Sequence, residues 1–511
     1  MARSRPSGTQ TLARLFAAYG VRRVYTVPGD LSFGLLAAFL AEGMQVTSCR
    51  SQATAVFAAA GDVYASGKLQ SLVLAPRGPG VQNAMAAMAS TMDNGLPVLL
   101  VSPTEDQGTD RTGGFQAGTT GLQSGDGFAV LHVHSPERAC AEVAEVLTQC
   151  SGPLRNSALI EIPRSLLDAE LAPAEATPAP EQPINTGDLQ RMAEVLAEAK
   201  HPVMVVGHQA RWSLDLGALE ALAKRLNAPI CPTGLTIGFA GEEVETLGQD
   251  AVHDALAQAD AVLLVGAALD WTLRLGAAIA PSATVFQLRD HPDTPAGARQ
   301  PDLVALGDLG ETLRALTQAI PPRAASPFAT PMGARPLPPK LRAQVLDALA
   351  RDFPARTGLV LDGGTGLILA ARNIRPDAPW ARLTPGLTGH LGGGLGHAMG
   401  LMASGRFDQV VLVSGDFSLG LSLADLETVQ RLGLPVKILV ANNLGMAGGK
   451  LQMRPKTPGL VDYHAATDYA AIMRGFGGEG HLLRSLDDWP QIATQLFATR
   501  APCLVDMREE G

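Results

Sequence analysis

The chain contains 511 residues, of which 46% are hydrophobic and 17% charged, and it carries a net charge of −9. Because domains usually contain about 100–200 residues, a chain of this length predicts three domains. No basic stripe pairs with aromatic residues, which argues against nucleic acid as a partner. The five cysteines are scattered and never spaced C-x-x-C, which argues against a zinc site or a disulfide framework and favours buried, reduced thiols.

The chain shows no targeting or membrane signal. Residues 1–10 are polar and lack the apolar core of a signal peptide, and no stretch of about 18 apolar residues occurs. We therefore expect a cytoplasmic protein without a membrane span.

Two segments rich in proline and alanine, 167–183 and 321–339, have no periodic apolar face and are typical of linkers. They divide the chain into thirds of domain size. The predicted domains are 1–166, 184–320 and 338–511.

Each third alternates short apolar runs with amphipathic helical stretches. In the first third, strands are predicted at 23–27, 45–49, 71–75 and 97–102, with helices at 31–43, 53–65 and 84–90. Further strands are predicted at 202–207, 228–233 and 261–266, and then at 358–362, 410–416 and 436–443. Continuous apolar strands that alternate with helices indicate parallel sheets covered by helices. The predicted fold is therefore α/β, with three consecutive doubly wound parallel-sheet domains.

Ligands of open parallel sheets bind at the carboxyl ends of the strands, so the loops there are the first places to look for a site. The most informative region lies in the last third, where a buried strand ends at Gly415-Asp416 and a helix follows. Glycine lets the backbone approach an anion, and a helix N-terminus offers free N–H groups to phosphate. The next strand ends at Asn442-Asn443, and adjacent parallel strands would bring the two tips together. Asp416, Asn443 and a backbone carbonyl near Gly445 make a plausible Mg²⁺ ligand set, because Mg²⁺ takes about six oxygens and shares them with phosphate.

This stretch resembles the thiamine diphosphate (ThDP) motif, which begins Gly-Asp-Gly, or with Ala or Ser in the third position, and ends Asn-Asn. The spacing from Asp416 to Asn443 matches without a gap, and residues 425–428 match an internal part of the motif. The third position departs from the pattern, because Phe417 stands where a small residue is usual. The resemblance implies ThDP and Mg²⁺ as cofactors. It assigns to cofactor binding Gly415, Asp416, Phe417, Ser418, Asn443, Gly445 and Met446, with Asp416, Asn443 and Gly445 as the metal ligands.

Two segments upstream resemble further parts of this family. In 384–400, Leu391 takes the place of the apolar residue that bends the cofactor, and the same glycines also suit a close helix-packing seam. The loop after the strand at 358–362 resembles a diphosphate-side loop through Gly364 and Thr365. His390 is a candidate for proton transfer, although a lone histidine is more often structural.

The first third resembles the acetolactate synthase-like branch of the same family in 20–30, 49–61, 75–90, 93–102 and 115–118. This resemblance places Gly29, Asp30, Asn83, Phe115 and Gln116 near the substrate. Asp30 also suits a second role as the cap of a helix that begins at Leu31. In this family a glutamate hydrogen-bonds the pyrimidine ring of ThDP and drives its activation, whereas the matching residue here is Gln52.

Glutamine is neutral and does not exchange a proton, although its amide still donates hydrogen bonds. Three interpretations stay open: an active enzyme with altered activation, an acid supplied by another residue, or a non-catalytic homologue that binds a ligand or acts as a scaffold. Loss of general acid–base help typically costs about 10²–10⁴-fold in rate.

The resemblance implies a lyase or transferase that decarboxylates a 2-oxo acid and passes the carbanion–enamine to a carbonyl acceptor. A simple 2-oxo acid decarboxylase is the alternative among enzymes. The family builds its site between subunits, which implies a homodimer or homotetramer. Some relatives hold FAD in the middle domain, but nothing in this sequence requires it, and we expect none.

Overall fold

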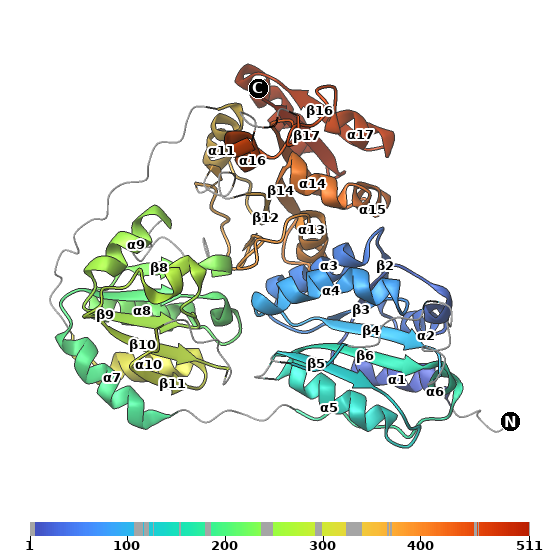
Figure 1. The fold of residues 1–511 in the computed structure, drawn as a ribbon, viewed down its shortest axis with the longest axis horizontal. Helices are drawn as coiled ribbons and strands as arrows, with labels where there is room; N and C mark the ends of the chain where they lie inside the picture. The colour runs from blue at the N-terminus through green and yellow to red at the C-terminus, as the bar shows by residue number, and fades with distance from the viewer. Residues whose placement is uncertain are drawn as a thin grey trace. The chain divides into compact units, whose positions relative to one another are not determined.

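The computed structural model describes residues 6–106, 116, 122–125, 127–152, 155–178, 185–236, 249–291, 299–322, 340–364, 367, 370–371, 373–453, 457 and 459–509. Three parallel sheets follow one another along the chain, each flanked by helices (Figure 1). Two compact units result, one made of 1–179, 339–374 and 383–511 and the other of 180–338 and 375–382. The predicted α/β fold of three parallel-sheet domains in series is confirmed.

The first sheet has the strand order β2-β1-β3-β4-β6-β5, and its paired strands are parallel. Its central strands are wholly buried, as expected of apolar strands covered on both faces. The strands are β1 (Arg23–Thr26), β2 (Gln45–Ser48), β3 (Ser71–Leu74), β4 (Leu99–Thr104), β5 (Phe128–His132) and β6 (Ser157–Pro163). The helices are α1 (Gly8–Ala18), η1 (Asp30–Ser32), α2 (Phe33–Ala41), α3 (Gln52–Ser66), α4 (Pro79–Asp93), α5 (Ala139–Ser151) and α6 (Arg164–Asp168).

The middle sheet has the order β11-β10-β9-β7-β8, again with parallel pairs. Its strands are β7 (Pro202–Val206), β8 (Ile230–Pro232), β9 (Ala261–Val265), β10 (Thr284–Arg289) and β11 (Leu303–Leu306). Its helices are α7 (Thr186–Glu198), η3 (His208–Arg211), α8 (Leu216–Leu226), η4 (Gly234–Thr236), α9 (Gln249–Gln258), η5 (Trp271–Gly276) and α10 (Leu309–Ala319).

The third sheet has the order β13-β12-β14-β15-β17-β16, and the strands from β12 to β16 pair in parallel. Its strands are β12 (Thr357–Asp362), β13 (Arg382–Leu383), β14 (Gln409–Gly415), β15 (Val436–Asn442), β16 (Glu479–Leu483) and β17 (Cys503–Arg508). Its helices are α11 (Leu341–Arg351), α13 (Gly394–Ala403), α14 (Asp416–Ser422), α15 (Asp425–Arg431), α16 (Ala447–Met453), α17 (Tyr469–Gly475), η6 (Leu486–Asp488) and α18 (Trp489–Ala498).

Helices α3 and α13 pack together and join the first and third sheets within one unit. Their approach depends on glycine, because a Cβ on Gly61 would lie 2.6 Å from the carbonyl oxygen of His397. A Cβ on Gly400 would likewise collide with the carbonyl oxygen of Ala58. The glycine-rich packing seam predicted for 384–400 is therefore present.

Two segments differ from the predicted linkers and domains. Leu167 and Leu171 belong to the first buried core, so the start of the predicted linker 167–183 packs on the first domain. Residues 375–382 belong to the unit of the middle sheet, where the Arg211 guanidinium lies 5.0 Å from the centre of the Trp380 ring. Most of the predicted linker 321–339 lies outside the described residues.

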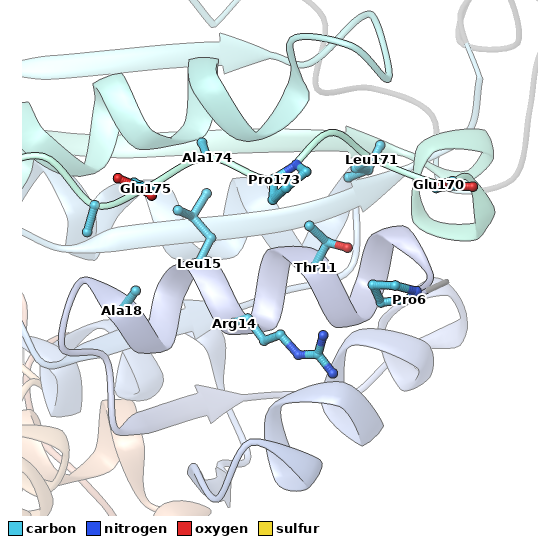
Figure 2. A pocket seen from close by; sticks show the side chains of 11 residues that line it. Pro6, Thr11, Arg14, Leu15, Ala18, Glu170, Leu171, Pro173, Ala174 and Glu175 are labelled. Carbon is cyan, nitrogen blue, oxygen red and sulfur yellow. The ribbon is translucent and has the colours of Figure 1, made fainter. Parts of the chain in front are cut away.

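A cavity of about 590 Å³ lies between α1 and residues 170–176. Figure 2 shows Leu15 pointing from α1 toward the segment that carries Pro173 and Ala174. No residue that the sequence analysis assigns to a site lines this cavity.

Candidate cofactor site

Asp416 and Asn443 lie at the carboxyl ends of β14 and β15, which are neighbours in the third sheet. The Asp416 side chain is buried, and its carboxylate accepts hydrogen bonds from the backbone N–H groups of Phe417 and Gly445, both at 2.8 Å. Burial raises the pKa of this carboxyl group, while the two N–H donors and the charge of Lys450 act to lower it. Adjacent strand tips therefore bring the two predicted ligands together.

The amide of Asn443 faces a set of oxygen atoms. One of its two terminal atoms lies 2.6 Å from the carbonyl oxygen of Gly445 and 3.2 and 3.3 Å from the carboxylate oxygens of Asp416. With the amide nitrogen on that side, Asn443 donates to these acceptors. With the amide oxygen there, only oxygens converge, which is the environment that a hard cation requires.

The spacing of these oxygens fits Mg²⁺. Octahedral Mg²⁺ binds oxygen at about 2.0–2.1 Å, which places neighbouring ligand oxygens about 2.9 Å apart. The observed separations of 2.6–3.3 Å lie on either side of that value. Asp416, Asn443 and the Gly445 carbonyl thus fit Mg²⁺ and leave its other positions to phosphate oxygens and water.

The loop that carries these oxygens has a shape that only glycine suits. Gly445 has φ of 144°, and a Cβ there would collide with the carbonyl oxygen of Val461. The backbone N–H of Met446 donates to the same Val461 oxygen at 3.0 Å. The Lys450 ammonium donates to the Asn443 carbonyl and pairs with Asp462 at 3.3 Å.

A second layer of buried polar groups supports the strand ends. Asn442 donates to Asp506 at 2.9 Å, so it acts as a support whereas Asn443 faces the candidate metal ligands. Asp506 also accepts from the backbone N–H of Tyr469, whose hydroxyl donates to the Asp416 carbonyl at 3.1 Å. Burial and the nearby Asp416 carboxylate raise the pKa of Tyr469, which keeps its hydroxyl a donor.

Asp362 supports the candidate site, although the sequence analysis assigned it no role. It is buried at the end of β12 and accepts hydrogen bonds from the backbone N–H groups of Gly392 at 3.1 Å and Gly394 at 2.8 Å. Burial raises its pKa to about 6, although these bonds and one from Ser418 oppose the shift. Asp362 thereby holds the turn that carries Leu391. An aspartate that ends a buried strand just before two glycines was the available signal.

The remaining residues of the predicted diphosphate side have varied surroundings. Gly364 and Met446 are exposed, whereas Leu391 and Phe417 are half-buried. Ser418 is buried against Asp362. Thr365 lies outside the described residues.

Gln52 is the first residue of α3 and is half-buried. The Asn83 amide donates to its side-chain oxygen at 3.5 Å, which leaves the Gln52 amide nitrogen as a donor. A Cβ on Gly29 and one on Gly80 would each lie 2.8 Å from Pro76, so the loop after β1 and the first turn of α4 pack on the same proline. The structure thus brings Gly29, Gln52 and Asn83 together where β1 and β3 end.

In the part of the chain that the structure describes, no carboxylate hydrogen-bonds to Gln52. Among the described residues, no acid is therefore in direct contact with this amide. Whether an acid reaches the pyrimidine ring by another route stays a prediction to be tested.

His390 lies between α3 and α4, with its ring 5.1 Å from that of Phe57 in an edge-on arrangement. Burial lowers the pKa of His390, whereas a hydrogen bond with the Ala86 backbone acts to raise it. The net shift is downward, so the neutral form is favoured. His397 also packs edge-on against Phe57, with ring centres 4.9 Å apart, and is buried, which lowers its pKa to about 3. His397 is therefore a core residue.

Asp30, Phe115 and Gln116 complete the set of residues predicted to lie near the substrate. Asp30 is the first residue of η1, whose cap position belongs to Gly29, so Asp30 does not cap a helix that begins at Leu31. The turn starts one residue earlier because the Ser32 hydroxyl accepts a hydrogen bond from the Gly29 N–H and donates one to the Gly29 carbonyl. Gln116 is half-buried with φ of 54°, and Phe115 lies outside the described residues.

Three family models match the chain in order. They describe the N-terminal TPP binding domain, the central domain and the C-terminal TPP binding domain of thiamine pyrophosphate enzymes, and they match residues 6–124, 189–316 and 362–507. Together the matched segments cover most of the chain and include the loops described above.

Curated relatives match nearly the whole chain at about one quarter identity. A 2-hydroxyacyl-CoA lyase of Oryza sativa is 25% identical over 98% of this chain and 95% of its own. The acetolactate synthase large subunit of Mycobacterium tuberculosis is 25% identical over 97% and 94%. A solved structure from Mycobacterium smegmatis, provisionally assigned as a thiamin diphosphate-dependent enzyme, aligns with a TM-score of 0.84 at 19% identity over 99% and 100%.

No helix in the described part of the chain is long and apolar enough to cross a bilayer.

Proposed function

This chain belongs to the thiamine pyrophosphate enzyme family, and on that premise we propose that it decarboxylates a 2-oxo acid and transfers the remaining acyl group to a carbonyl acceptor. The predicted resemblance to ThDP enzymes of the acetolactate synthase-like branch is confirmed by the family models and by relatives of that name. The reaction class, decarboxylation followed by transfer to a carbonyl acceptor, is the part that the proposal adds.

The convergence of oxygens at the carboxyl edge of the third sheet carries the proposal. Asp416, Asn443 and the Gly445 carbonyl would hold Mg²⁺, and Mg²⁺ would neutralise the diphosphate of ThDP. When bound, ThDP supplies a nucleophilic carbon that attacks carbonyl groups and stabilises negative charge. The chain's own residues then have to position, activate and shield that group.

Gln52 would orient the pyrimidine ring without exchanging a proton. Because Asn83 occupies its side-chain oxygen, Gln52 presents its amide nitrogen as a donor. A neutral donor holds a ring nitrogen in place but gives no general acid–base help, which is worth about 10²–10⁴-fold in rate. We therefore expect slower cofactor activation than an acid at this position would give. A homodimer or homotetramer with sites shared between subunits completes the proposal.

The names of several relatives favour a second candidate reaction. The 2-hydroxyacyl-CoA lyases of rice, Arabidopsis thaliana and yeast match the chain as fully as the synthases do. Cleavage of a carbon–carbon bond in a 2-hydroxyacyl thioester is the reverse type of step to carboligation and needs the same cofactor carbon.

A binding and turnover experiment separates these functions. Purified protein is titrated with ThDP and Mg²⁺ and then supplied with a panel of 2-oxo acids, with and without aldehyde or keto acceptors, and with 2-hydroxyacyl-CoA thioesters. Release of CO₂ with a longer product supports carboligation, CO₂ with only the aldehyde supports a simple decarboxylase, and thioester cleavage supports the lyase. Absence of saturable ThDP binding refutes the cofactor assignment, and binding without any turnover supports a non-catalytic homologue.

A second experiment tests Gln52 itself. The variant Gln52→Glu should exchange the C2 proton of bound ThDP about 10²-fold faster than the wild type, since it restores acid–base help. The variant Gln190→Glu, on an exposed position of α7 in the other unit, serves as the matched control. An unchanged exchange rate in Gln52→Glu would show that residue 52 does not reach the pyrimidine ring.

A further inference from the structure

Three ligand-type side chains gather at the amino edge of the third sheet, opposite the cofactor loops. Glu479 is the first residue of β16, Cys503 is the first residue of β17, and His481 follows on β16. Parallel pairing sets Glu479 beside Cys503, and alternate residues of a strand share a face, so the three side chains share one face of the sheet. Figure 1 shows β16 and β17 side by side at this end of the chain.

The ligand atoms of these residues lie within 4.8 Å of one another. In a tetrahedral Zn²⁺ site, with metal–ligand bonds of about 2.0–2.3 Å, the ligand atoms lie about 3.3–3.8 Å apart. The cluster is therefore about 1 Å wider than a closed site. Glu479 is exposed, and rotation of its side chain can supply this movement without a change in the strands.

The burial of the other two residues favours a ligand. Cys503 is wholly buried, and the Nε2 atom of His481 is buried without a hydrogen-bond partner among the described residues. An unpartnered buried polar atom is destabilising, and a bond to a metal or to a bound water would remove that cost. Thiolate and imidazole ligands select ions of the Zn²⁺ class over Mg²⁺.

The charges nearby are compatible with a divalent ion. Lys437 lies beside Cys503 on β15, but its ammonium donates to the carbonyl oxygens of Thr499 at 2.6 Å and Ala501 at 2.7 Å. A thiolate and a carboxylate neutralise a divalent ion, so Lys437 would face a neutral centre. Only the thiolate form of cysteine is a metal ligand, so a metal that binds here displaces the proton of the Cys503 thiol.

We propose that Glu479, His481 and Cys503 form a second metal site, which binds a divalent transition-metal ion of the Zn²⁺ class and clamps β16 to β17. Three protein ligands leave a fourth position for water. β15 extends from Lys437 at this edge to the cofactor loop after Asn442, about 20 Å away at about 3.3 Å per residue. The site is thus separate from the Mg²⁺ site, and it does not depend on the proposed reaction.

Cobalt titration of the full chain tests this proposal. Protein stripped with a chelator is titrated with Co²⁺, and one equivalent should produce a thiolate-to-cobalt charge-transfer band in the near ultraviolet and intense visible bands of tetrahedral cobalt. Zn²⁺ should remove both signals, and excess Mg²⁺ should not. Absence of the charge-transfer band in the wild type overturns the proposal.

Variants identify the ligands. Cys503→Ser should abolish the charge-transfer band, whereas Cys231→Ser, a buried cysteine of β8 in the other unit, should keep it. Glu479→Gln changes an exposed side chain and should weaken Co²⁺ binding at least about tenfold with the far-ultraviolet spectrum unchanged. An unaltered Co²⁺ affinity in Glu479→Gln or a persistent band in Cys503→Ser would place the metal elsewhere.

Discussion

The two edges of the third sheet carry polar clusters of contrasting chemistry. At the carboxyl edge, the Asp416 carboxylate and the Gly445 carbonyl present oxygen atoms 2.6–3.3 Å from the terminal atom of the Asn443 amide, whose oxygen can complete the set. At the amino edge, Glu479, His481 and Cys503 present one oxygen, one nitrogen and one sulfur. Oxygen ligands suit Mg²⁺, and nitrogen and sulfur suit ions of the Zn²⁺ class.

The origin of the two clusters also differs. The carboxyl edge is built by the loops that follow the strands, which is where open parallel sheets usually bind ligands. The amino edge is built by strand residues, whose positions follow from the register of β16 and β17. One sheet can thus carry loop residues suited to a metal and phosphate at one edge, and strand residues suited to a bare ion at the other edge. We expect the two clusters to act independently.

The largest effect is expected from Asp416→Ala. Loss of this carboxylate should weaken Mg²⁺-dependent ThDP binding at least about 1,000-fold, more than the 10–100-fold that loss of an outer-shell partner costs. Calorimetric titration with ThDP and Mg²⁺ measures it, with Asp408→Ala, an exposed partner of Arg356, as the control. Tight ThDP binding in Asp416→Ala would refute the metal assignment, and a loss of the cobalt signal in the same variant would refute the independence of the edges.

Asp362→Asn should change how stability depends on pH. Burial raises the folded-state pKa of Asp362 from 3.8 to about 6, so its contribution to stability is present at acidic pH and is lost as the pH rises through about 6. The wild type should lose about 3 kcal/mol of unfolding free energy over this pH range. Asp362→Asn should not, because asparagine does not titrate. The denaturant concentration at the midpoint of unfolding should therefore rise for Asp362→Asn, relative to the wild type, as the pH increases from about 4 to about 7.

Chemical denaturation of both proteins over this range measures the difference. Asp408→Asn, whose carboxylate is exposed, should follow the wild type throughout. A constant offset between Asp362→Asn and the wild type at every pH would show that Asp362 is not a strained buried acid.

Gly445→Ala tests the loop geometry of the carboxyl edge. With φ of 144° and the Val461 carbonyl in the way, an alanine here should weaken ThDP binding by about 2 kcal/mol, or about 30-fold. Gly448→Ala, in α16 with open space around its Cα, should stay within about threefold of the wild type. Equal behaviour of the two variants would mean that the Gly445 carbonyl has no special position.

The sequence predicted much of the fold and of the carboxyl edge for a clear physical reason. Apolar strands and amphipathic helices are local patterns, and Asp416 and Asn443 each end a strand, so adjacency of those strands is enough to bring them together. Phe417 and Gln52 were visible as departures from a motif. The surroundings of the Phe417 ring at the diphosphate and the effect of Gln52 on activity stay predictions.

What the sequence did not reveal depends on packing between distant segments. Asp362 becomes important because the turn before α13 folds back onto it. The cluster of Glu479, His481 and Cys503 depends on strand register, and cysteine spacing alone argued against any zinc site. The association of 375–382 with the middle sheet likewise has no local signal, because it depends on contacts such as that between Arg211 and Trp380.

The smallest expected effect separates the two edges electrostatically. Lys437→Gln removes a buried charge beside Cys503 and keeps an amide donor for the carbonyls of Thr499 and Ala501. Exchange of a thiol proton for a divalent ion adds one positive charge, so loss of the Lys437 charge should tighten Co²⁺ binding by about 1.4 kcal/mol, or about tenfold. ThDP affinity should change much less, because about 20 Å of strand separates Lys437 from the cofactor loop and the Coulomb energy falls with distance. Weaker Co²⁺ binding in Lys437→Gln would mean that Lys437 holds the thiolate in place. A matching change in ThDP affinity would mean that the two clusters are energetically coupled through β15.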